Sequence, residues 1–150
     1  MHSFLLTLHS LVRWVALIFG VLAAGRALIG WRGKIEWKPL DSQFGLLFTI
    51  GMDIQLLLGL LLYFFFSPIT TNAFADFGAA MSNTQVRFFL VEHLFLMLAA
   101  VVLAHVGRAL SKRAAEAAQK HQKAALFFTL AVVAMLIAIP WSRPLFRLGG

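Results

Sequence analysis

The chain has 150 residues, of which 61% are hydrophobic and 13% charged, and it contains no cysteine. A soluble domain of average composition is about half apolar and one-quarter charged, so this balance indicates an integral membrane protein. The absence of cysteine excludes disulfides, thiolate metal sites and iron–sulfur clusters. The formal net charge of +7 fits the basic cytoplasmic loops of a membrane protein better than it fits nucleic-acid binding.

Four continuous apolar segments are long enough to cross a bilayer, which takes about 20 helical residues. They cover residues 4–24, 44–66, 88–106 and 124–139. Their apolar residues do not alternate with polar ones, which disfavours a β-barrel. No basic stretch precedes the first segment and Arg26 follows it closely, so we expect a retained helix rather than a cleaved signal. The sequence therefore predicts an all-α protein with one domain, an integral membrane four-helix transmembrane bundle.

The basic residues predict how this bundle is oriented. Most of the 13 Lys and Arg residues lie in two connections, at 25–42 and 107–123, which are on the same side of a four-helix protein. The other side carries Arg87, Arg143 and Arg147. By the positive-inside rule, the two basic connections face the cytoplasm of a bacterial inner membrane, and both termini lie on the periplasmic or outer side. The polar segment at 67–86 is expected to fold over the outer mouth of the bundle.

Two histidines, His9 and His93, lie at matching depths in the first and third segments. Each is about five residues from the outer end of its helix, or roughly 8 Å below the surface of the hydrocarbon. Ionisable groups in membrane spans are candidates for function, and haem iron takes two axial imidazoles from facing helices of a bundle. The pair therefore predicts a haem b site, with His9 and His93 as iron ligands. The alternative is that each histidine makes a structural hydrogen bond to a neighbouring helix.

Small residues follow both histidines on the same helix faces: Ala16 and Gly20 after His9, and Ala100 and Ala104 after His93. They leave room for a flat ring, although small residues also serve plain helix packing. The similar stretches VLAAGRAL at 21–28 and LAHVGRAL at 103–110 suggest two related helix pairs.

The remaining histidines and metals give weaker signals. His105 follows His93 by 12 residues rather than the 14 that would return it to almost the same face, so a second haem is disfavoured. His105 could pair with His121, but solvated structural roles are favoured for both. Zinc is a runner-up ligand because Glu92 adjoins His93, although consecutive helical residues point about 100° apart and rarely chelate together.

Three charged residues, Arg13, Asp53 and Glu92, also fall within the predicted spans. An unpaired charge at that depth costs several kcal/mol, so each needs a partner. We expect Arg13 to reach Asp53, Glu92 or both, either as an ion pair that ties helices together or as part of a proton path or quinone site.

Several motifs together resemble a known group of proteins. They are HSLVRW near the start, DIQLLLGLLLYFFFSP in the second segment, RFFLVEH at the start of the third, KHQK before the fourth and IPW near its end. The chain resembles small bacterial four-helix membrane proteins that are often labelled cytochrome b-like. In that pattern the recurring positions are His9, Arg13, Asp53, Gln55, Arg87, Glu92 and His93. The chain lacks the paired histidines at 14-residue spacing of larger b-type cytochromes, so the resemblance does not imply a two-haem wire.

Three functions remain open at this point. The first is a b-type cytochrome-like redox subunit that binds one haem near the outer surface and passes electrons within the membrane, to or from quinone. The second is a haem-free accessory subunit of a larger respiratory or photosynthetic complex, and the third is a small proton or ion transporter. The sequence shows no nucleophile–base set and no phosphate loop, so an electron-transfer or accessory role is favoured over a stand-alone enzyme. Partners would be the bilayer and either a larger complex or further copies of the chain.

Overall fold

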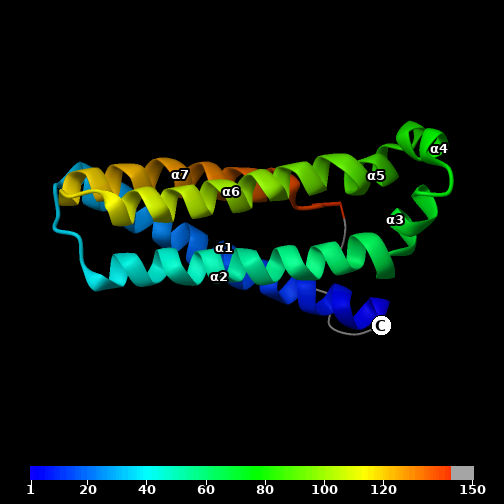
Figure 1. Cartoon of the computed structure of the whole chain (residues 1–150), viewed down its shortest axis with the longest axis horizontal. Coiled ribbons are helices and arrows are strands. Elements are labelled where there is room, and N and C mark those ends of the chain that lie inside the picture. The colour runs from blue at the N-terminus through cyan, green and yellow to red at the C-terminus, as the bar shows by residue number, and fades with distance from the viewer. Residues whose placement is uncertain (143–150) are drawn as a thin grey trace.

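In the computed structural model, which describes residues 1–142, the chain folds into a bundle of four long helices (Figure 1). These are α1 (His2–Gly33), α2 (Pro39–Leu61), α6 (His93–Arg113) and α7 (Ala117–Ala138). A π-helical segment, η1 (Leu62–Phe66), extends α2, and another, η2 (Phe88–Glu92), precedes α6. Including these extensions, four helical segments are long and apolar enough to span a membrane. The all-α bundle predicted from the sequence is confirmed at this level, and the described residues contain no strand.

The helices are longer than the apolar segments that predicted them. α1 continues nine residues past the expected end at 24, and α6 continues seven residues past 106. The connections therefore shrink to residues 34–38 and 114–116. Hydropathy marks only the lipid-compatible part of a helix, whereas backbone hydrogen bonding continues through any residues that tolerate helical geometry, including Ala, Arg and Leu. α1 ends at Lys34, which takes the left-handed conformation (φ 51°) and donates its N–H to the Gly30 carbonyl.

The polar segment at 67–86 is itself helical. It forms α3 (Pro68–Ala73), α4 (Phe77–Ser82) and the start of α5 (Thr84–Arg87). Asp76 caps α4 by accepting from the Ala79 N–H at 3.0 Å. These short helices lie at one end of the bundle, away from the two short connections (Figure 1).

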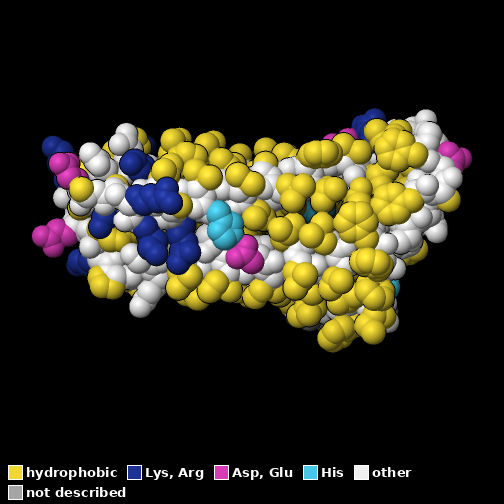
Figure 2. Space-filling view, viewed as in Figure 1, with side chains coloured by type: hydrophobic (Ala, Val, Ile, Leu, Met, Phe, Trp, Pro, Cys, Tyr) yellow, Lys and Arg dark blue, Asp and Glu magenta, His cyan; other side chains and the backbone are white. Residues whose placement is uncertain are grey.

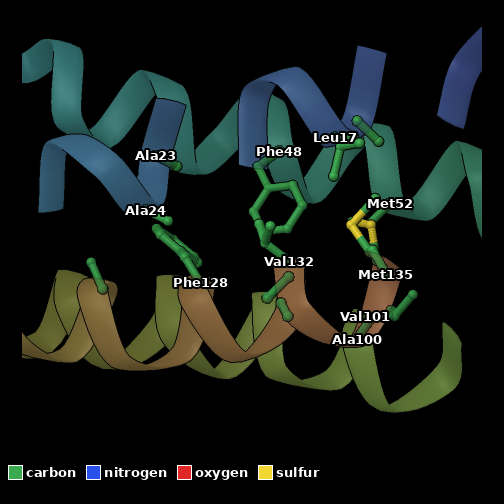
Figure 3. Packing of buried hydrophobic residues seen from close by; sticks show 14 of the residues in the cluster. Leu17, Ala23, Ala24, Phe48, Met52, Ala100, Val101, Phe128, Val132 and Met135 are labelled. Carbon is green, nitrogen blue, oxygen red and sulfur yellow. The ribbon is translucent and has the colours of Figure 1, made fainter. Parts of the chain in front are cut away.

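The core is built from small residues of α1, α6 and α7 and a few large side chains that fill the middle (Figure 3). Phe48 of α2 and Phe128 of α7 meet edge to face, with ring centres 5.7 Å apart. Met52 and Met135 pack next to them, and both are buried. Small residues let helices approach closely where lipid gives no hydrophobic drive between them. Large apolar side chains cover the outside instead, and Figure 2 shows a broad yellow surface with Lys and Arg gathered toward one end.

The end of α7 is fixed by its sequence. Pro140 has no N–H to donate to the Leu136 carbonyl, four residues earlier, and the Trp141 indole N–H takes its place at 2.9 Å. A further carbonyl near this helix end, that of Ala138, accepts a hydrogen bond from a side chain of α6. Arg143 and Arg147, which the sequence placed on the side opposite the basic connections, lie outside the described residues.

Candidate functional site

The structure brings His9 of α1 and His93 of α6 together across the bundle. Their ring centres are 6.4 Å apart and the ring planes meet at 60°. The sequence predicted only that the two histidines lie at the same depth in their helices. It is the diagonal placement of α1 and α6, with α2 and α7 between them, that makes the two rings face each other.

Each histidine is anchored through one ring nitrogen. His93 Nδ1 is 2.8 Å from the Ala138 carbonyl oxygen and donates to it, which leaves Nε2 as the lone-pair nitrogen. His9 Nε2 is 3.0 Å from Gln55 Nε2 of α2. The other nitrogen of His9 and the other amide atom of Gln55 are buried without a partner in the described part of the chain. Turning the Gln55 side-chain amide by 180° exchanges its nitrogen and oxygen. In either orientation, one ring nitrogen of His9 and one amide atom of Gln55 remain for a ligand.

A cavity of about 190 Å³ adjoins both rings. Its wall is mostly apolar, with polar groups from α1, α2, η1, α3 and α6. The polar residues and histidines that line it are His2, His9, Ser10, Arg13, Gln55, Tyr63, Ser67, Thr70 and His93. A few polar groups in an apolar wall are typical of ligand sites. The contributions of His2, Ser10, Ser67 and Thr70 were not predicted from the sequence. Ser10 and Ser67 lie within the motifs HSLVRW and DIQLLLGLLLYFFFSP, but a lone serine is no signal of a ligand site, and His2 and Thr70 lie outside the motifs.

The two π-helical segments form part of this cavity wall. Leu62 and Tyr63 of η1 and Phe89 of η2 all line it. The Tyr63 hydroxyl donates to the Leu90 carbonyl at 2.9 Å, so η1 and η2 are joined directly. Single π-helical turns within helices are frequently found at functional sites.

The charged residues pair differently from the expectation. Asp53 Oδ1 is 2.7 Å from His105 Nε2, and both side chains lie on the outside of the bundle. Glu92 Oε1 accepts from Arg87 Nε at 2.9 Å. Two separate pairs therefore replace the predicted network, because Asp53 points away from the helix that carries Arg13.

Arg13 lines the cavity instead. Its guanidinium donates to Ser10 at 3.2 Å and lies 5.3 Å from the Trp14 ring centre. A cation in an apolar wall is costly, so this placement keeps Arg13 among the candidate site residues.

Two further expectations are corrected. The small residues after His9 do not leave a slot for a ring, since Ala16 packs against Gly51 and Gly20 faces the Phe48 ring. His121 is neither solvated nor paired with His105: it is buried against Trp37, with ring centres 4.8 Å apart. In both cases a neighbouring helix fills space that the one-helix pattern left open.

The residues present meet part of what a haem needs. Two imidazoles that bind one metal from opposite sides at about 2 Å have ring centres roughly 6 Å apart, close to the observed spacing. In metal sites, the ring nitrogen of a histidine that does not bind the metal commonly donates to a backbone carbonyl. His93 Nδ1 donates to the Ala138 carbonyl in this way. The described residues contain no group of three or more His, Cys, Asp or Glu that could hold a metal alone, so a metal here needs further ligands such as a porphyrin. The cavity is smaller than the roughly 300–1,000 Å³ of sites for larger ligands, so a macrocycle also requires Gln55 and its neighbours to move.

Comparison with known proteins adds no family: no family model, no curated protein and no solved structure matches this chain. The resemblance to cytochrome b-like proteins therefore stays a prediction from the motifs.

Proposed function

We propose that this protein is a small redox subunit of the bacterial inner membrane that binds one haem b between His9 and His93. The observation that carries the proposal is the facing of these two rings at 6.4 Å, one of them already oriented by a carbonyl. When bound, the haem iron supplies one-electron transfer by cycling between its ferric and ferrous states.

The protein residues would hold and tune this group. His93 offers Nε2 while Ala138 fixes its ring, and His9 offers its ring once Gln55 turns aside. The mostly apolar wall would exclude water. Arg13, at the same wall, would place a positive charge near the site and so favour the reduced state.

In the same proposal all four helices span the membrane, with the short basic connections in the cytoplasm and both termini outside. The length and apolar character of the helices support insertion, and the charge of the connections supports the orientation. The cavity then lies in the outer half of the bilayer, next to the helices formed by residues 67–86.

The test is a dithionite-reduced minus oxidised spectrum of protein expressed with ample haem, with haem quantified per chain. We expect a sharp α-band and about one haem per chain in the native protein. His9→Ala and His93→Ala should each lose the band, whereas the matched control His105→Ala, at a histidine outside the cavity, should keep it.

If His93 had only a structural role, His93→Ala could still lose haem because the bundle unfolds. His93→Met separates the two cases, because methionine can still ligate iron and should retain haem at a raised reduction potential. A colourless native protein would reject the haem proposal and leave the accessory-subunit function as the stronger candidate.

A quinone is a second candidate ligand, favoured by the volume of the cavity. An apolar cavity of roughly 150 Å³ holds one benzene ring, so about 190 Å³ suits a single substituted ring. His9 and Gln55 would hydrogen-bond its carbonyl oxygens. Purified protein that lacks haem but carries an extractable isoprenoid quinone, which Gln55→Leu loses, would favour this function over the haem.

A further inference from the structure

A second cavity, of about 170 Å³, lies between α2 and α6 at the opposite end of the bundle from the histidines. The first turns of α2 and the last turns of α6 form it, and Phe128 of α7 closes its base. The short connection before α2 contributes Trp37. Nothing in the proposed redox function uses this cavity.

Two cations that line this cavity have no side-chain partner in the described part of the chain. Arg108 and Lys112 are one turn apart on α6, and neither side chain has an ion pair or hydrogen bond within residues 1–142. Figure 2 shows a compact group of Lys and Arg side chains on the face formed by α2 and α6. Two unpaired positive charges beside one cavity attract an anion.

The one acid in the wall does not cancel this charge. Asp41 is 5% exposed, and its carboxylate is held by Arg26 at 2.6 Å and by the Lys38 N–H at 2.8 Å. The Asp41 charge is therefore balanced by Arg26, and the cavity keeps a net positive charge from Arg108 and Lys112.

A neutral donor, the Ser42 hydroxyl, completes the site. The Ser42 hydroxyl accepts from the Trp37 indole N–H at 2.8 Å, so its own proton is available to a further acceptor. A water molecule takes about 30 Å³ of liquid, so a cavity of about 170 Å³ has room for the four oxygens of a phosphate group.

The position of the cavity selects the source of that phosphate. Leu46 lines it, and Leu46, Leu47 and Ile50 are all exposed along the same stretch of α2. This apolar surface leads away from the cations into the part of the helix that is apolar enough to lie in lipid. Basic pockets between helices at the cytoplasmic surface bind anionic headgroups in this way.

We propose that the cavity between α2 and α6 binds the phosphate headgroup of an anionic membrane lipid through Arg108, Lys112 and Ser42, with the acyl chains along α2. The headgroup would bridge two helices whose direct contact is less extensive than that of the other neighbouring pairs. Bound lipid therefore stabilises the bundle.

The test uses delipidated full-length protein in detergent, with phosphatidylglycerol added to mixed micelles and phosphatidylcholine as the neutral lipid. Thermal unfolding followed by tryptophan fluorescence gives the apparent lipid affinity, and native mass spectrometry counts retained lipid. We expect phosphatidylglycerol to raise the unfolding midpoint more than phosphatidylcholine. Each Lys or Arg near a headgroup contributes roughly fivefold in affinity, so Arg108→Gln/Lys112→Gln should weaken binding about 25-fold.

The matched control is Arg32→Gln/Arg113→Gln, which removes the same charge from exposed residues at the same end that do not line the cavity. This control should bind as tightly as the native protein. Lys112→Gln alone, at an exposed position where folding is not at risk, should weaken binding about fivefold.

Three results would overturn the proposal. One is an equal loss in the control, which would mean general attraction to a basic surface. Another is native affinity in both Arg108→Gln/Lys112→Gln and Lys112→Gln. The third is equal stabilisation by inorganic phosphate alone, which would make the ligand a free anion rather than a lipid.

Discussion

Gly20→Ala should destabilise the bundle, because Gly20 is where α1 passes Phe48, one of the two phenylalanines that fill the core. A Cβ at this position would lie 2.7 Å from Phe48 Cε2, 3.0 Å from Phe48 Cζ and 3.0 Å from Val132 Cγ2. Phe48 is completely buried and packs edge to face on Phe128, so its ring has no free space to enter.

The size of the effect follows from two opposing contributions. Forcing an extra methyl into a packed core costs about 1–3 kcal/mol. Alanine gains up to about 1 kcal/mol over glycine from helix propensity. The net expectation is a loss of about 1 kcal/mol in the free energy of unfolding, the middle of the range of about 0–2 kcal/mol that the two contributions leave.

The control lies five residues away on the same helix. A Cβ at Gly25 meets nothing within 4 Å, so Gly25→Ala keeps the propensity gain without the clash and should be neutral or stabilising. Unfolding in detergent with added denaturant measures both variants. Gly20→Ala should also lower the free energy of unfolding by less when it is combined with Phe48→Leu. If Gly20→Ala is as stable as Gly25→Ala, the close packing of α1 on α2 described above is incorrect.

Two further predictions address the end of the bundle that carries η1 and η2, and the proposed orientation. Tyr63→Phe removes the hydrogen bond that joins η1 to η2 through the Leu90 carbonyl, and should lower the free energy of unfolding by about 1 kcal/mol in the same assay; an unchanged stability would mean that this bond contributes nothing. The native chain has no cysteine, so Asn72→Cys in α3 and Glu36→Cys in the connection before α2 report sidedness cleanly. A membrane-impermeant maleimide should label Asn72→Cys in intact cells and Glu36→Cys only after permeabilisation, and the reverse pattern would refute the proposed orientation.

The sequence by itself determined the class of fold. Continuous apolar segments of bilayer length leave a helix as the way to satisfy every backbone group, so four helices followed from composition and length. Local chemistry was also readable in part: Pro140 ends α7, and the depths of His9 and His93 follow from counting residues along a helix.

The tertiary structure alone decided which residues meet. Depth along one helix says nothing of rotation or of which helices are neighbours, so Asp53 was matched with Arg13 although it faces His105 on the outside. The same limit applied to Gly20, whose apparent free space is filled by Phe48 from α2. The cavity beside Arg108 and Lys112 likewise depends on how α2, α6 and α7 pack together, which a pattern read along one chain segment does not contain.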